Sequence, residues 1–163
     1  MTLVYNTEQL SQKIIQPHFI NIESAICSYI QSADEIFICS AWLSSDAILE
    51  AASTRDAKLL MNCSGKMNSA SYEYNPNFLK KVLKAIPDSY VYTSDRGILH
   101  HKFIVLRANQ RPYAVITGSY NYTHQAQSNC ENIVYIYDDK VAMAYQDEFN
   151  RLLNSSSTKR LRQ

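Results

Sequence analysis

Glycine is scarce in this chain, with only three among 163 residues. They are Gly65, Gly97 and Gly118. This scarcity excludes the G-x-G-x-x-G loop of dinucleotide-binding domains and the G-x-x-x-x-G-K-[ST] phosphate loop, because both need closely spaced glycines. It also argues against an all-β protein built from many glycine-rich turns.

Cysteines are few, and no two of them form a C-x-x-C pair, which argues against a zinc ribbon. The four are Cys27, Cys39, Cys63 and Cys130. We expect them to be reduced, as is usual for a chain in the cytosol, and a disulfide is the alternative.

Long apolar runs are also missing. The sequence has no stretch of 18 apolar residues, and its first ten residues show no charged segment followed by an apolar one. It therefore predicts neither a membrane span nor a signal peptide. The net charge is only +1, so total charge does not indicate a polyanionic partner, although a local basic site is compatible with it. We expect a cytoplasmic protein with no membrane partner.

What the sequence does contain is an alternation of helix and strand patterns, which predicts an α/β fold. We expect a mixed sheet flanked by helices on both faces, in a single domain over residues 1–153. Residues 154–163 form a basic polar tail that we expect to be disordered. Asn21, and Ser44 or Ser45, are candidate caps of the first two helices. The predicted helices are 21–33, 44–53, 77–86 and 139–153, and the predicted strands are 35–42, 57–62, 89–93, 101–107, 113–119 and 132–137.

Three short segments between residues 99 and 132 carry side chains that suggest chemistry. The first is His100-His101-Lys102, at the start of a predicted strand. Side chains alternate between the two faces of a strand, so His100 shares a face with Lys102 and His101 points the other way. We therefore expect a structural hydrogen-bonding role for His101.

The second segment is Gly118-Ser119-Tyr120-Asn121, and the third contributes Glu131. Together these segments supply the groups that handle a phosphate. An ammonium, a hydroxyl and an amide donate hydrogen bonds to phosphate oxygens. A neutral imidazole can attack phosphorus, and a carboxylate can fix the tautomer of that ring. Such a set requires no metal and no other cofactor.

The order H-x-K, G-S-x-N and a downstream glutamate resembles the signature of the phospholipase D superfamily. The phrase HHKFIVL…VITGSYNYT is similar to the single-motif bacterial nuclease and mitochondrial phosphodiesterase branches. The resemblance covers about residues 15–153 and implies a phospholipase D-like fold and a metal-independent phosphodiesterase. It further implies that Lys102, Ser119, Asn121 and Tyr120 bind substrate. The catalytic residues that it implies are His100, Lys102, Ser119, Asn121 and Glu131.

The chain departs from the usual pattern of the superfamily at two places. Arg107 stands where an aspartate is usual, five residues after the motif lysine, and that aspartate has a mainly structural role in the family. The segment between Lys102 and Gly118 is longer than usual, and we assign the surplus to a loop over residues 108–112. The chain also holds one copy of the motif where the family's chemistry needs two. The resemblance therefore implies a homodimer with its active site on the two-fold axis.

The leading interpretation is an endonuclease that cleaves nucleic acid, DNA in preference to RNA, through a phosphohistidine on His100. One alternative is a phosphodiesterase directed at phospholipids, which would call for a membrane anchor or a basic amphipathic helix. Another is a non-catalytic module that binds nucleic acid with the same pocket. The 12 tyrosines fit base stacking as well as ordinary packing in a core or an interface.

Overall fold

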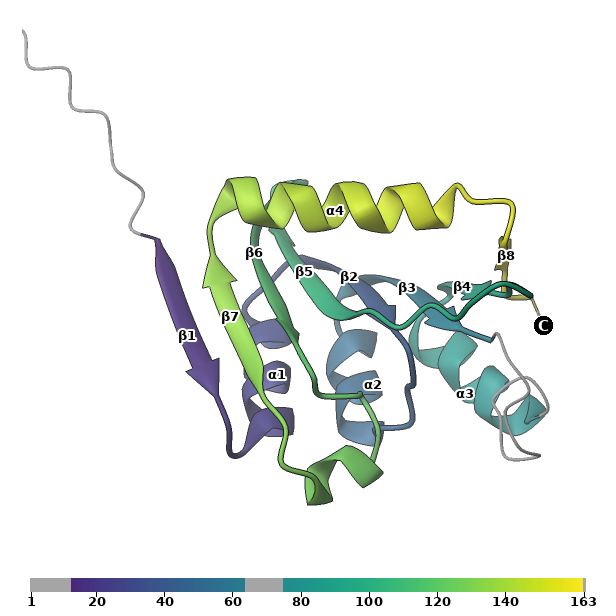
Figure 1. Ribbon diagram of the computed structural model, residues 1–163, viewed down its shortest axis with the longest axis horizontal. Helices are drawn as coiled ribbons and strands as arrows, with labels where there is room; N and C mark the ends of the chain where they lie inside the picture. The colour runs from purple at the N-terminus through teal and green to yellow at the C-terminus, as the bar shows by residue number, and fades with distance from the viewer. Residues whose placement is uncertain (1–12, 64–74, 163) are drawn as a thin grey trace, which may run out of the picture.

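A computed structural model describes residues 13–63 and 75–162 of the chain. Within these residues, eight strands form one mixed sheet in the order β1-β7-β6-β5-β2-β3-β4-β8 (Figure 1). Strands β2, β3 and β4 run parallel to one another, and the other neighbours are antiparallel. The strands are β1 (Ile14–His18), β2 (Glu35–Ser40), β3 (Asp56–Asn62), β4 (Asp88–Tyr92), β5 (Lys102–Ala108), β6 (Arg111–Gly118), β7 (Ile133–Tyr137) and β8 (Thr158–Arg160).

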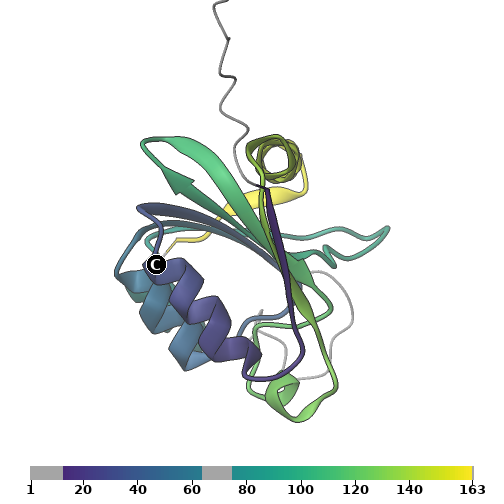
Figure 2. The same cartoon turned by 90° about the vertical axis from the view of Figure 1, so that its left-hand side faces the viewer.

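Helices cover both faces of the sheet, as predicted (Figures 1 and 2). One face carries α1 (Ile22–Gln31), α2 (Asp46–Ser53) and α3 (Pro76–Ala85), and the other carries α4 (Asp139–Leu153). A short 3-10 helix, η2 (Gln125–Ser128), lies between β6 and β7. The predicted fold class, a mixed sheet between two helical layers, is confirmed.

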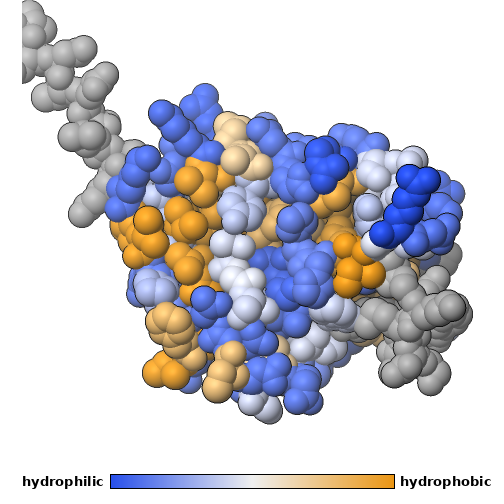
Figure 3. All heavy atoms as spheres, in the orientation of Figure 1, coloured by the Kyte–Doolittle hydropathy of each residue, from blue (hydrophilic) through white to orange (hydrophobic). Residues whose placement is uncertain are grey.

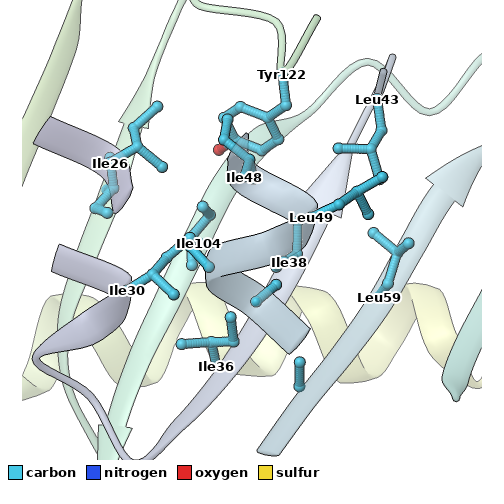
Figure 4. Packing of buried hydrophobic residues seen from close by; sticks show 14 of the residues in the cluster. Ile26, Ile30, Ile36, Ile38, Leu43, Ile48, Leu49, Leu59, Ile104 and Tyr122 are labelled. Atoms are coloured by element: carbon cyan, nitrogen blue, oxygen red, sulfur yellow. The ribbon is translucent and has the colours of Figure 1, made fainter. Parts of the chain in front are cut away.

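Each face of the sheet has its own hydrophobic cluster. Ile104 and Leu106 of β5 belong to the cluster under α1, α2 and α3, part of which Figure 4 shows. Phe103 and Val105 belong to the cluster under α4. The alternation predicted for this strand is therefore confirmed, and it fixes which face each motif side chain approaches.

The two predicted helix caps have different outcomes. Ser45 caps α2, because its hydroxyl accepts a hydrogen bond from the backbone N–H of Ile48 at 3.2 Å. Asn21 precedes α1 in a left-handed conformation with φ of 52°, and its side chain makes no capping bond. Asn21 therefore occupies the N-cap position of α1, as predicted, but its left-handed backbone does not let the side chain reach the first turn.

The prediction of a disordered tail is wrong at residues 158–160. These residues form β8, which pairs antiparallel with β4, and the N–H of Leu161 donates to the carbonyl of Ser89 at 2.9 Å. Without β8, the edge of β4 would expose a row of unpaired backbone groups. Backbone pairing of this kind leaves little trace in a short polar sequence.

Strand β1 is the other edge strand, and the sequence analysis missed it. Four of its five residues are exposed, so the strand lacks an alternating pattern. It contains Pro17, which is tolerated at an edge because no ladder hydrogen bond is needed on its outer side. Apolar side chains are visible on the left of Figure 3, the side on which Figure 1 shows β1 and β7. Ile15 of β1 is 71% exposed.

The loop predicted over residues 108–112 is a tight turn instead. Strand β5 continues to Ala108 and β6 begins at Arg111, so only Asn109 and Gln110 connect the two strands. Both turn residues have positive φ, 51° and 63°, as a two-residue hairpin requires. The extra length relative to the usual motif spacing is therefore not held in a long loop, and the pairing of β5 with β6 shifts register between Leu106 and Arg107.

Candidate active site

Strand topology brings the three motif segments to one edge of the sheet. Because β5, β6 and β7 are antiparallel neighbours, the starts of β5 and β7 lie beside the end of β6. Phe103 pairs with Thr117, and Gly118 pairs with Ile133. The motif residues immediately beyond these pairs therefore project from adjacent strands. We call this edge the site edge.

Lys102 and His100 are in direct contact at the site edge. The ammonium of Lys102 donates to the backbone carbonyl of His100 at 2.9 Å and lies 3.4 Å from its Nδ1. Burial lowers the pKa of Lys102, while the negative charge of Glu131 opposes this shift. Burial also lowers the pKa of His100, and the charges of Lys102 and His101 add to the effect. The neutral imidazole, the form that can attack phosphorus, is thereby favoured.

Ser119 and Glu131 form the other half of the site. The hydroxyl of Ser119 donates to the carboxylate of Glu131 and accepts from the N–H of Asn132 at 3.1 Å. The side-chain amide of Asn129 donates to the second carboxylate oxygen at 3.3 Å. Within one chain, these hydrogen bonds of Glu131 go to a hydroxyl and an amide and not to an imidazole.

The remaining two predicted site residues, Asn121 and Tyr120, are less accessible. Asn121 is half-buried, and its Oδ1 is buried with no hydrogen-bond partner among the described residues. Tyr120 is only 2% exposed and packs in the core under α1 and α2, where burial raises its pKa to about 12. The tyrosine ring is therefore not placed to stack on an exposed base.

Trp42 is a site residue that the sequence analysis missed. Its ring lies 4.9 Å from that of His100 in an edge-to-face arrangement, and the Lys102 ammonium lies 5.6 Å from its centre. Trp42 follows β2, whose last residue, Ser40, pairs with Lys102. The sequence signal is a tryptophan directly after an apolar strand, but its use requires knowing that β2 and β5 are antiparallel neighbours.

Glu23 anchors the segment that follows the G-S-x-N motif, and the sequence analysis missed it as well. Its carboxylate accepts from the hydroxyl of Ser45 at 2.6 Å and from the amide of Gln127 at 2.9 and 3.0 Å. The backbone N–H groups of Ser44 and Ser45 also donate to the carbonyl of Tyr122. These bonds tie α1, the start of α2 and η2 together, so the motif segment is held from three sides.

Two other residues singled out by the sequence lie away from this cluster. The Nε2 of His101 lies 3.1 Å from the Glu148 carboxylate on α4, a contact that fits its predicted structural role. Arg107 forms an ion pair with Glu35 at the opposite end of β5. Arg107 lies five positions along the extended strand from Lys102, about 17 Å away, so this departure does not alter the site.

The described segments, 13–63 and 75–162, contain no group of three or more histidine, cysteine, aspartate or glutamate side chains that could hold a metal ion. In the same segments, no helix is both long and apolar enough to cross a membrane.

A family model described as "Cardiolipin synthase, PLD-like domain" matches residues 26–153, which include every motif described above. The chain belongs to the phospholipase D superfamily.

Three known proteins show how far the similarity extends. The mimivirus protein L381, which is uncharacterized, is 26% identical over 187 residues, which cover 89% of this chain and 66% of L381. The mitochondrial cardiolipin hydrolase of Xenopus laevis is 49% identical over 57 residues, 34% of this chain and 25% of that protein. The structure of Nuc, a phospholipase D family member from Salmonella typhimurium, superimposes with a TM-score of 0.73 at 21% identity. It matches over 93% of this chain and 100% of Nuc, and therefore shares the fold.

Replacing Lys102 by methionine is expected to raise the pKa of His100 toward its ordinary value. The lysine charge repels the imidazolium, so its removal makes protonation easier and moves the NMR titration of the ring to higher pH. Lys58→Met is a matched control, because Lys58 pairs with Asp88 on another strand. An unchanged His100 titration in the Lys102 variant would contradict the arrangement.

Gly118→Ala is expected to destabilise the protein by about 1–3 kcal/mol, as overpacking of a close contact does. A Cβ at this position would lie 2.2 Å from the carbonyl oxygen of Asn132 and 2.7 Å from Cα of Ile133, both backbone atoms that cannot easily move aside. Urea denaturation measures the change. The control is Gly97→Ala, where a Cβ meets no atom within 4 Å. Equal stabilities of the two variants would show that β6 and β7 are less close than described.

Proposed function

We propose that this chain is a phosphodiesterase that cleaves nucleic acid, with DNA as the first substrate to test and RNA as the second, at a site formed by two copies of the chain. The observation that carries the proposal is the set at the site edge, where one imidazole, one ammonium and one hydroxyl-carboxylate pair gather from adjacent strands. Two-step transfer needs both a nucleophile and a separate acid. One chain supplies a single His-x-Lys, so a second copy supplies the other imidazole.

The first step forms a bond between Nε2 of His100 and phosphorus. The bond from phosphorus to the leaving oxygen breaks, and that oxygen takes a proton from His100 of the second copy. In the second step the imidazole of the second copy, which is neutral after giving up its proton, removes a proton from water. The water oxygen attacks phosphorus, and the bond from phosphorus to His100 breaks. The lowered pKa of His100 supports its role as the neutral nucleophile.

The other site residues stabilise the charge that develops on phosphorus oxygens. Lys102 and Asn121 supply N–H donors, and the ammonium adds positive charge. In this proposal the hydroxyl of Ser119 turns from Glu131 to donate to the bound phosphate. For Nε2 to attack, the ring proton must lie on Nδ1 and needs an acceptor. Glu131 of one chain bonds its own Ser119 and Asn129, so in this proposal its carboxylate orients the imidazole of the second copy.

Phospholipid is the second candidate substrate, because the 49% identity over 57 residues is to a protein named mitochondrial cardiolipin hydrolase. That match covers only a third of this chain. The superposition on Nuc covers nearly all of both chains and shows a shared fold, which is compatible with either substrate.

Cleavage of a single-stranded or double-stranded oligonucleotide is expected to continue unchanged in excess EDTA. The reason is that Lys102 and the imidazoles supply the positive charge that a metal would otherwise supply. Gel analysis of labelled DNA and RNA, beside the formation of phosphatidic acid from cardiolipin vesicles, measures both candidate activities. Loss of nucleic-acid cleavage on chelation, restored by Mg²⁺, would contradict the mechanism. Cleavage of the vesicles alone would transfer the proposal to the lipid.

A further inference from the structure

A cavity of about 470 Å³ lies beside the site edge, between the loop that joins β1 to α1 and the segment that follows the G-S-x-N motif. Its lining includes Phe19, Asn21, Glu23, Tyr120, Gln127 and Asn129. Figures 1 and 2 both show the β1–α1 loop next to η2, at the end of the molecule where β7 begins.

The cavity shares two residues with the surroundings of the active site. Tyr120 directly follows Ser119, and Asn129 donates to the carboxylate of Glu131 at 3.3 Å. The loop is brought there by strand pairing, because His18 at the end of β1 pairs with Ile133 at the start of β7. A group bound in the cavity would therefore be a direct neighbour of a phosphate held at the site edge.

The lining combines an aromatic ring with side-chain amides. Phe19 is 66% exposed, which is unusual for a phenylalanine and leaves its ring available to a ligand. Gln127 and Asn129 donate their amide N–H groups to the carboxylates of Glu23 and Glu131. Because these amide nitrogens lie toward the carboxylates, the carbonyl oxygen of each side chain can accept a hydrogen bond from a ligand. Asn21 adds a third amide that is not used as a helix cap.

The charge of the lining limits the chemical class of the ligand. It contains one carboxylate, Glu23, and no lysine or arginine among the residues that the structure describes. A second phosphate would be repelled there. An acyl chain would offer no hydrogen bond to the carbonyl oxygens of the lining amides, which is costly. A neutral planar ring with N–H groups along its edge meets both conditions.

We propose that this cavity is a nucleobase subsite that receives the base next to the cleaved phosphate, with Phe19 stacking on the base and the amide oxygens of Gln127 and Asn129 accepting from its edge. The inference rests on the proposed function. A base can enter only when it is unpaired, so the subsite makes single-stranded nucleic acid the preferred substrate.

The test compares Phe19→Ala with the unaltered chain on two substrates: a single-stranded oligonucleotide and bis(p-nitrophenyl) phosphate, a diester without bases. Loss of the stacking contact between Phe19 and one base is expected to raise KM for the oligonucleotide about tenfold. Hydrolysis of bis(p-nitrophenyl) phosphate should not change, and an oligonucleotide with an abasic residue beside the cleaved bond should be cut equally by both proteins. Phe19→Trp should keep the low KM. Ile15→Ala is the matched control, being an equally exposed apolar residue on β1 that is not part of the cavity wall.

The outcomes distinguish failure of the subsite proposal from failure of the proposed function on which it rests. If the unaltered chain cuts the oligonucleotide and Phe19→Ala leaves its KM unchanged, the subsite is overturned and the nuclease proposal stands. Equal losses on both substrates would also overturn it, because they indicate a general effect on the fold. If Phe19→Ala instead impairs only cleavage of cardiolipin vesicles, the cavity serves a lipid. If the unaltered chain hydrolyses bis(p-nitrophenyl) phosphate and no nucleic acid, the proposed function itself fails.

Discussion

Replacing His100 by alanine should reduce turnover at least about a thousandfold, the scale expected when a nucleophile is removed. His101→Ala should retain most of the activity. Only His100 lies at the site edge in contact with Lys102 and Trp42. His101 contacts Glu148 on α4, and its side chain is 50% exposed, so the loss of this contact should cost at most about 1 kcal/mol.

Steady-state rates on an oligonucleotide measure the activity of the two variants. Circular dichroism confirms that both are folded. The two substitutions remove the same side chain from adjacent positions, so each controls for the other. If His101→Ala were the inactive variant, the nucleophile would be wrongly assigned. If both variants kept full activity, the phosphohistidine mechanism would be excluded.

Much of this fold could be predicted because most of its elements bury a face. Ile104 and Leu106 alternate with Phe103 and Val105, and each pair enters a different cluster, so the pattern is visible in the sequence. Strands β1 and β8 escape prediction for the opposite reason. They are edge strands whose stability comes from backbone pairing with β7 and β4, and their exposed side chains carry no period.

In the candidate site, too, residues in a local pattern are predictable and residues placed by strand pairing are not. His100, Lys102, Ser119 and Glu131 stand in compact motifs and can be found by spacing. Trp42 cannot, because its relation to the motif depends on the antiparallel pairing of Ser40 with Lys102 across 62 positions of sequence.

Glu23 is hidden for a similar reason, since it reaches Gln127 only through the packing of α1 beside η2. Its role depends on tertiary structure that no local pattern expresses. The contacts that hold the motif segment in place are therefore harder to predict than the reactive groups themselves.

A mixed dimer of one unaltered subunit and one His100→Ala subunit should be as inactive as the dimer that carries two substitutions. In the proposed mechanism one imidazole attacks phosphorus while the other protonates the leaving oxygen, so a single histidine cannot complete the cycle. The two subunits can be given different affinity tags, expressed together and purified through both tags, which isolates the mixed dimer. Its rate should fall at least about a thousandfold below that of the unaltered dimer.

Random assortment of unaltered and His100→Ala subunits provides a second test of the shared site. When equal amounts of the two subunits are refolded together, only dimers with two intact histidines should act. The activity should then follow the square of the unaltered fraction and fall to about a quarter. Two independent sites per dimer would leave about half of the activity in both the mixture and the purified mixed dimer. That result, or a fully active monomer by light scattering, would exclude the shared site, because each chain would then have to supply nucleophile and acid by itself.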